Sequence, residues 1–105
     1  MKNSCLSFLQ WSLVFIGTIL SAQAEKITFP AADGLEVTAD LYRASEDLAT
    51  PMIVLFHQAG FSRGEYLQIA PRLVGMGFNC LAVDQRSGKA TAGVTDETAA
   101  SGNLP

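Results

Sequence analysis

The side chain of this sequence that could most directly perform chemistry is its single histidine, His57. It opens the stretch 57–60, His-Gln-Ala-Gly, which follows an apolar run over residues 52–56 and precedes a helix-like segment after Ser62. A strand, a tight polar loop and a helix in this order place the loop where open α/β sheets bind ligands. A strand-end histidine bonded only to backbone is the alternative, and the sequence leaves both open.

Few other reactive groups join His57. The sequence contains no Gly-x-Ser-x-Gly motif, and no acidic residues combine with histidine or cysteine at metal-ligand spacing. Gly75 and Gly77 follow a helical segment and precede a strand, which is typical of helix-ending glycines and not of a dinucleotide-binding loop. We therefore predict neither a metal nor a cofactor.

The first 24 residues have the pattern of a secretory signal peptide. Lys2 precedes an apolar stretch that is densest over residues 13–20, and Ala22-x-Ala24 matches a cleavage site. We predict cleavage after Ala24, a secreted or periplasmic location and no membrane contact afterwards. Only Cys80 would remain, so no internal disulfide is expected, and scattered basic residues in a chain of net charge −3 argue against nucleic acid as a partner.

The segment after the predicted leader alternates as a β-hairpin does. Residues 26–29 predict a first strand, Asp33-Gly34 a turn, and residues 35–42 a second strand with one face toward water. On that solvent face we expect the even-numbered members, Glu36, Thr38, Asp40 and Tyr42.

The remaining elements form a β-α-β pattern. The run 52–56 predicts a strand buried on both faces. A helix to about Val74 follows, with Ser62 and Glu65 as a capping box and Pro71 dividing it into two pieces. Residues 78–83 predict a second interior strand, and from residue 90 onward we expect an irregular segment. For Arg63 and Arg86 the simpler expectation is that each is a surface charge exposed to solvent.

Taken together, these elements resemble the N-terminal part of an α/β-hydrolase, closest to the dienelactone-hydrolase-like serine esterases and peptidases. The resemblance rests on two stretches: residues 57–60 after the third strand, and residues 84–88, Asp-Gln-Arg-Ser-Gly, after the fourth. The chain departs from the family pattern at Gln58, Ser87 and Lys89, where glycine is commoner. The resemblance spans roughly residues 25–99 and implies an incomplete α/β sheet that stops before the nucleophile elbow.

The resemblance also implies a role for the loop. In this family a tetrahedral oxyanion is stabilised by two backbone N–H groups, one of them from the loop after the third strand. The donor implied here is the N–H of Ala59, with Gln58 as the neighbouring candidate, while His57 and Gly60 would shape the loop. Asp84 and Arg86 would tie adjacent loops together by charge-assisted hydrogen bonds.

We therefore expect a leader over 1–24, a partial α/β-hydrolase domain over 25–98 and an irregular tail over 99–105. The complete enzyme would hydrolyse a small ester, lactone or short peptide, using a Ser/Cys-His-Asp triad beyond Pro105, and the chain alone would be inactive. The alternative is a small exported binding or structural module without catalytic activity.

Overall fold

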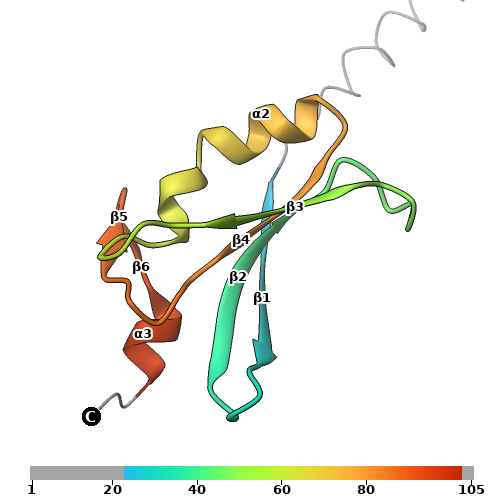
Figure 1. The fold of residues 1–105 in the computed structure, drawn as a ribbon. Coiled ribbons are helices and arrows are strands. Elements are labelled where there is room, and N and C mark those ends of the chain that lie inside the picture. Colours follow the sequence, from blue (N-terminus) through green and yellow to red (C-terminus); the bar gives the residue numbers. More distant parts are fainter. Residues whose placement is uncertain (1–22, 103–105) are drawn as a thin grey trace, which may run out of the picture.

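A computed structural model describes residues 23–102 of the chain. Its elements in chain order are β1 (Ala24–Pro30), β2 (Glu36–Tyr42), β3 (Met52–Phe56), the 3-10 helix η1 (Arg63–Tyr66), α2 (Ile69–Gly75), β4 (Asn79–Val83), β5 (Ala90–Thr91), β6 (Val94–Thr95) and α3 (Glu97–Ser101). A mixed sheet of four strands has the order β1-β2-β4-β3, and β5 pairs with β6 in a separate small sheet (Figure 1). The chain is thus a small mixed α/β domain, and its assignment to an α/β-hydrolase sheet stays a prediction.

Two of the expectations concern the N-terminal region. The leader predicted over residues 1–24 lies outside the described residues, apart from its last two. Among residues 23–102, none of the helices is both long and apolar enough to cross a membrane.

The predicted β-hairpin is confirmed. β1 and β2 pair antiparallel from Ala24 opposite Tyr42 to Pro30 opposite Glu36. The turn closes through hydrogen bonds from the N–H of Gly34 to the carbonyl of Ala31 and from the N–H of Ala31 to the carbonyl of Leu35. Gly34 has a φ of 87°, a conformation that glycine adopts without steric cost.

The predicted solvent face of β2 is wrong for three of its four members, and only Glu36 is exposed. Thr38, Asp40 and Tyr42 are buried, with exposed fractions of 4%, 7% and 2%. Asp40 and Tyr42 lie opposite Ala82 and Cys80 of β4, so they share the face that α2 and η1 cover. The alternation along β2 is present, but its polar side faces inward. Arg63 lies on that side and forms an ion pair with Asp40.

The predicted β-α-β unit is also present, with one correction to its strands. β4 lies inside the sheet between β2 and β3, as expected of an interior strand, and pairs parallel with β3. β3 is an edge strand instead of an interior one. Its residues Met52, Val54 and Phe56 are 48%, 45% and 60% exposed, so the prediction of burial on both faces is wrong for the described chain.

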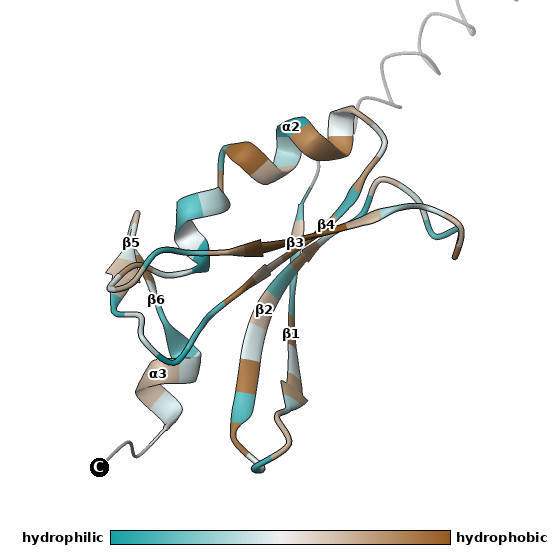
Figure 2. Ribbon diagram, in the orientation of Figure 1, coloured by the Kyte–Doolittle hydropathy of each residue, from teal (hydrophilic) through white to brown (hydrophobic). Residues whose placement is uncertain are grey.

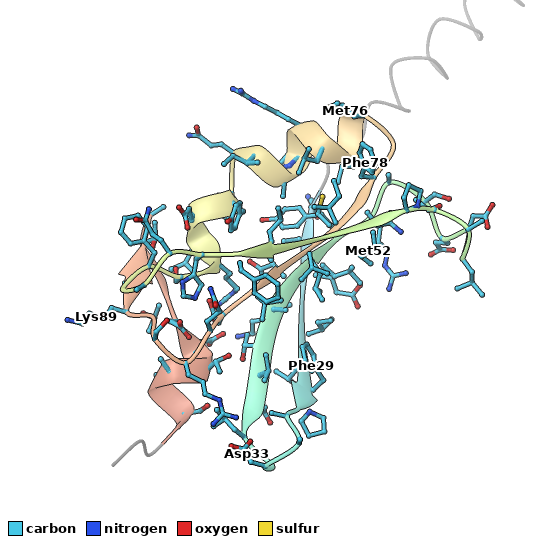
Figure 3. The ribbon with its side chains drawn as sticks, viewed as in Figure 1. Phe29, Asp33, Met52, Met76, Phe78 and Lys89 are labelled. Carbon is cyan, nitrogen blue, oxygen red and sulfur yellow. The ribbon has the colours of Figure 1, made fainter. Side chains whose placement is uncertain are left out.

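The face of the sheet opposite α2 is apolar and uncovered. In Figure 1, α2 lies over one side of the strands, and none of the helices of residues 23–102 packs on the other side. Figure 2 shows hydrophobic residues along β3 and β4, and Figure 3 labels Met52 and Phe29 on β3 and β1. The strand registers give the members of this apolar face as Ile27, Phe29, Val37, Ala39, Leu41, Met52, Val54, Phe56, Leu81 and Val83.

The predicted helix consists of two pieces, as Pro71 suggested. Pro71 lies in the first turn of α2, where a backbone N–H has no partner within the helix, so the proline costs little. Ser62 is the N-cap of η1 and accepts from the N–H of Gly64. The capping box is wrong, because the Glu65 carboxylate turns to Gln58 instead of to the N–H of Ser62.

The helix-ending role of Gly77 is confirmed. Gly77 has a φ of 96°, and its N–H donates to the carbonyl of Val74. The N–H of Phe78 donates back to the carbonyl of Leu73, which completes a Schellman-type ending.

The irregular segment predicted from residue 90 onward, including the start of its tail at residue 99, is wrong up to residue 101. β5 and β6 form a short hairpin, and α3 follows with Asp96 as its N-cap. This segment has no apolar periodicity because it is held by polar contacts: Ser62 donates to the carbonyl of Val94, and the N–H of Ser62 donates to Thr91.

The apolar core is small and lies between α2 and the sheet. Its buried members are Tyr42, Ala70, Cys80 and Ala82. Cys80 is a free, buried thiol. Six partly buried side chains pack around this cluster: Ile53, Leu55, Tyr66, Leu73, Val74 and Phe78.

Candidate functional site

The candidate site is the loop over residues 57–62, between β3 and η1. Because β3 and β4 are parallel, their carboxyl ends meet at one edge of the sheet, where His57 and Asp84 follow them directly. In open α/β sheets, ligands bind beside these carboxyl ends of the strands. The segment 88–101 packs beside the same edge, since the N–H of Gly60 donates to the carbonyl of Ser87 and the N–H of Lys89 donates to that of Phe61.

His57 lies inside this edge and is only 4% exposed. Its Nδ1 is 2.8 Å from the carbonyl oxygen of Gln58, and the backbone N–H of Gln85 donates to its Nε2 at 2.8 Å. The side-chain amide of Gln85 also donates to the carbonyl of His57. Both ring nitrogens therefore meet backbone groups, which is the arrangement expected of a side chain that shapes a loop.

The two candidate oxyanion donors differ in their contacts. The N–H of Gln58 donates to Glu65 Oε2 at 3.1 Å, and its side-chain amide donates to Oε1 at 3.1 Å. Ala59 is exposed, and within residues 23–102 its N–H meets no hydrogen-bond acceptor. Of the two, Ala59 is the donor that is open to an incoming ligand.

The loop's shape depends on Gly60 and on the carbonyl of Gln58. Gly60 has a φ of 82°, a left-handed conformation that residues with a side chain rarely adopt. The carbonyl of Gln58 accepts from the N–H of Phe61 at 3.1 Å as well as facing the His57 ring. Together these contacts fix the direction of the peptide between Gln58 and Ala59.

Arg63 is the ionic centre beneath the loop, and its expected role as a solvated surface charge is wrong. Its side chain is 9% exposed and meets three carboxylates: Nε is 3.0 Å from Asp40, Nη1 is 2.5 Å from Asp84, and Nη2 is 3.2 Å from Glu97. Burial disfavours the charged guanidinium, but the hydrogen bond with Asp84 and the charge of Asp40 outweigh it and raise the pKa of Arg63.

Asp84 links three segments, which confirms its expected structural role. Its carboxylate accepts from the backbone N–H of Arg63 at 2.8 Å, from the Arg63 guanidinium and from the N–H of Glu97 at 2.9 Å. Arg86 ties the β4 loop to the hairpin turn through Asp33 at 2.7 Å, in an exposed pair. Both contacts are charge-assisted ties between loops, of the kind that the resemblance implied for these two residues.

Asp96 completes the site and was not singled out from the sequence. Its Oδ2 lies 3.1 Å from His57 Nε2, with both side chains fully buried. Gly88 permits this approach, because a Cβ at position 88 would lie 1.7 Å from the same oxygen. The one sequence signal for Asp96 is that an aspartate before Glu97 and three small residues is a typical helix N-cap.

His57, Asp84 and Asp96 bring ligand-type atoms within 4.8 Å of one another. They do not offer a free ligand set. Both oxygens of Asp84 accept hydrogen bonds from Arg63 or Glu97, and His57 Nε2 accepts from the N–H of Gln85. A guanidinium beside Asp84 further disfavours a metal cation.

Comparisons of the chain with protein-family models, with curated proteins and with solved structures give no match.

Proposed function

We propose that this chain is part of an exported α/β-hydrolase that acts on esters, lactones or short peptides, and that the loop 57–62 supplies one backbone N–H of its oxyanion hole. The nucleophile, the acid and the catalytic histidine would come from residues that follow Pro105 in the complete protein. By itself the chain would bind no cofactor and catalyse no reaction.

The observation that carries the proposal is the N–H of Ala59. It lies at the carboxyl end of a parallel strand, in an exposed loop whose neighbouring peptides are held by His57, Gly60 and Glu65. A donor fixed before substrate arrives stabilises a developing oxyanion without reorganisation, and one such donor contributes roughly 3–4 kcal/mol to transition-state stabilisation.

The free edge of β3 supports the same proposal. β3 pairs only with β4 among the described strands, and its outward-facing Val54 and Phe56 are exposed. In an α/β-hydrolase the second oxyanion N–H follows the nucleophile at the end of another strand. A strand added along the free edge of β3 would bring that N–H beside Ala59.

A small binding or structural module is the competing function. It would have to remain monomeric with the apolar edge of β3 open to solvent, and exposed apolar edges promote association between chains. This cost favours the hydrolase proposal over the module.

The first experiment is to sequence the encoding DNA beyond the codon for Pro105. The proposal expects a continuation with Gly-x-Ser-x-Gly or Gly-x-Cys-x-Gly, followed by Asp and His. A stop codon with none of these motifs in any frame, together with a monomeric full chain that unfolds cooperatively, would establish the module instead.

The second experiment tests Ala59 in the complete protein. Ala59→Pro removes the backbone N–H, and we expect kcat on a chromogenic ester to fall by about 10²–10³. Ala59→Ser keeps the N–H and serves as the matched control with nearly unchanged kcat. Equal activity of the two variants would remove Ala59 from the oxyanion hole.

A further inference from the structure

The two outer strands of the four-stranded sheet differ in how their free edges are protected. β1 carries Glu25 and Lys26 and ends at Pro30, and charged residues and proline keep edge strands from pairing with other chains. β3, at the opposite edge, reads Met-Ile-Val-Leu-Phe and has none of these features. The sequence from 48 to 61 contains no Asp, Glu, Lys or Arg. The edge of β3 is therefore the one that suits a further strand.

The strand register shows which backbone groups lie along this edge. The N–H of Asn79 in β4 donates to the carbonyl of Pro51, so the odd-numbered residues along β3 direct their backbone groups toward β4. The even-numbered residues therefore direct theirs outward, and the outward carbonyl of Phe56 accepts from the hydroxyl of Tyr66. The outward N–H and C=O of Val54 meet no neighbouring strand within residues 23–102.

We propose that β3 pairs antiparallel with β3 of a second copy of this chain, about a two-fold axis at Val54, so that two sheets join edge to edge. In this register the two Val54 residues exchange both of their N–H···O hydrogen bonds. The N–H of Phe56 donates to the carbonyl of the partner's Met52, and the symmetry repeats this contact. The association is a property of the chain by itself and is independent of the proposed hydrolase function, in which a strand of the complete protein would take the same edge.

The side chains of β3 match one another in this register. On the uncovered face, Met52 lies opposite the partner's Phe56, and Val54 lies opposite its own counterpart. On the α2 face, Ile53 lies opposite the partner's Leu55. Directly opposite apolar side chains stabilise a strand pair, and the three on the uncovered face are 48%, 60% and 45% exposed in the single chain. Pairing therefore removes apolar surface from water without bringing like charges together.

Self-complementarity selects a second copy as the occupant. A two-fold interface uses the same patch on both molecules, and every opposed pair along β3 is already apolar. The same axis directs the fully exposed Leu48 at one end of the uncharged stretch toward the exposed Phe61 at the other end in the partner. A paired edge about 17 Å long covers less than the roughly 800 Å² per partner of a stable interface, so we expect a reversible dimer with a Kd of roughly 0.01–1 mM.

The first test measures the mass of the full chain by sedimentation velocity at concentrations below and above this Kd. Val54→Lys places two ammonium groups opposite each other at the two-fold axis, and like charges in that position oppose strand pairing. Because Val54 is 45% exposed, a lysine there reaches solvent in the single chain. We expect the Kd of this variant to rise by about tenfold or more.

Phe29→Lys is the matched control. Phe29 lies on the same uncovered face and is 38% exposed, but it belongs to β1 at the far edge of the sheet. We expect its Kd to equal that of the wild type. If Phe29→Lys weakened association as much as Val54→Lys, the copies would meet face to face, and if neither variant weakened it, they would meet elsewhere. Either result, or a wild type that stays monomeric at every concentration, would overturn the proposal.

Amide hydrogen exchange of the full chain locates the contact without a variant. The N–H groups of Val54 and Phe56 face the free edge, whereas those of Ile53 and Leu55 face β4. We expect protection of the first two to rise with protein concentration and protection of the second two to stay constant. Exchange at Val54 that did not change with concentration would contradict edge pairing.

A cysteine at position 54 tests the register. Directly opposite residues of a hydrogen-bonded antiparallel pair have Cα atoms about 5.5 Å apart, which is within disulfide range. We expect Val54→Cys to form a disulfide-linked dimer on mild oxidation. Ile53→Cys lies diagonal to its own counterpart, so it should not exceed the wild-type background from Cys5 and Cys80. Equal cross-linking of the two variants would overturn the two-fold at Val54.

Discussion

Replacing Arg63 by methionine should be among the most destabilising single substitutions in this chain. The guanidinium is 9% exposed and meets Asp40, Asp84 and Glu97, whose own side chains are 10%, 0% and 40% exposed. Methionine would leave the carboxylates of Asp40 and Asp84 buried without a cation, and removing one partner of a buried pair costs about 3–5 kcal/mol. A domain of this size has about 4–12 kcal/mol in total, so the substitution should remove a large fraction of the free energy of unfolding.

The measurement is urea unfolding of the full chain, followed by far-ultraviolet circular dichroism. Arg86→Met is the matched control, because Arg86 and Asp33 lie 2.7 Å apart but are 42% and 58% exposed. We expect the Arg86 variant to unfold with the wild type, since solvent screens an exposed pair. If Arg63→Met shifted the midpoint no more than Arg86→Met, the conclusion that burial makes this ion cluster essential would be refuted.

Two further predictions test smaller features. Gly88→Ala should destabilise the chain by about 3 kcal/mol, because the new Cβ would lie 1.7 Å from Asp96 Oδ2 and 2.4 Å from the carbonyl oxygen of Phe61, whereas Gly75→Ala meets nothing within 4 Å and serves as control. An equal effect of both substitutions in urea unfolding would contradict the packing argument. The hydrogen bond from Arg86 lowers the pKa of Asp33 to about 2, so its NMR titration should move toward 3.8 in Arg86→Met, and its small stabilising effect should be present above 3.8 and lost as the pH falls through about 2. An unchanged titration of Asp33 in this variant would show that the hydrogen bond from Arg86 does not lower its pKa.

The local elements could be predicted because their determinants are local. The turn at Asp33-Gly34 uses the φ of 87° that glycine allows, and Pro71 divides the helical region where its missing N–H is tolerated. The parallel pairing of β3 with β4 follows from an intervening helix, which makes a crossover connection the natural one.

The errors arise where contacts distant in sequence override local pattern. Thr38 and Asp40 look like a solvent face, and only the position of Arg63 gives the Asp40 carboxylate a partner inside, while the Thr98 hydroxyl accepts from the backbone N–H of Thr38. Residues 90–101 look irregular because their hairpin and helix bury almost no apolar surface. Their order comes from side-chain hydrogen bonds such as Ser62 to Val94, which have no periodic signature.

The candidate site was predictable only in part for the same reason. The loop 57–60 and Asp84 could be singled out because each follows an apolar strand. The choice between Gln58 and Ala59 as the free donor depends on the Glu65 side chain, which the capping-box pattern assigned elsewhere. Asp96 lies 39 positions after His57, so no motif spacing links the two residues that meet at 3.1 Å.

The two faces of the sheet differ in what holds them, and this difference determines how the chain should respond to change. On the α2 side the fully buried apolar residues are few, and the carboxyl end of the sheet is held by Arg63 and its carboxylates. On the other side Met52, Val54 and Phe56 remain exposed and contribute little apolar burial. Because the hydrophobic contribution is one-sided, breaking the charged cluster should remove a large part of the chain's stability. The loop that carries the Ala59 N–H is attached to that cluster, so any change that disturbs the buried charges should disturb the proposed oxyanion donor with them.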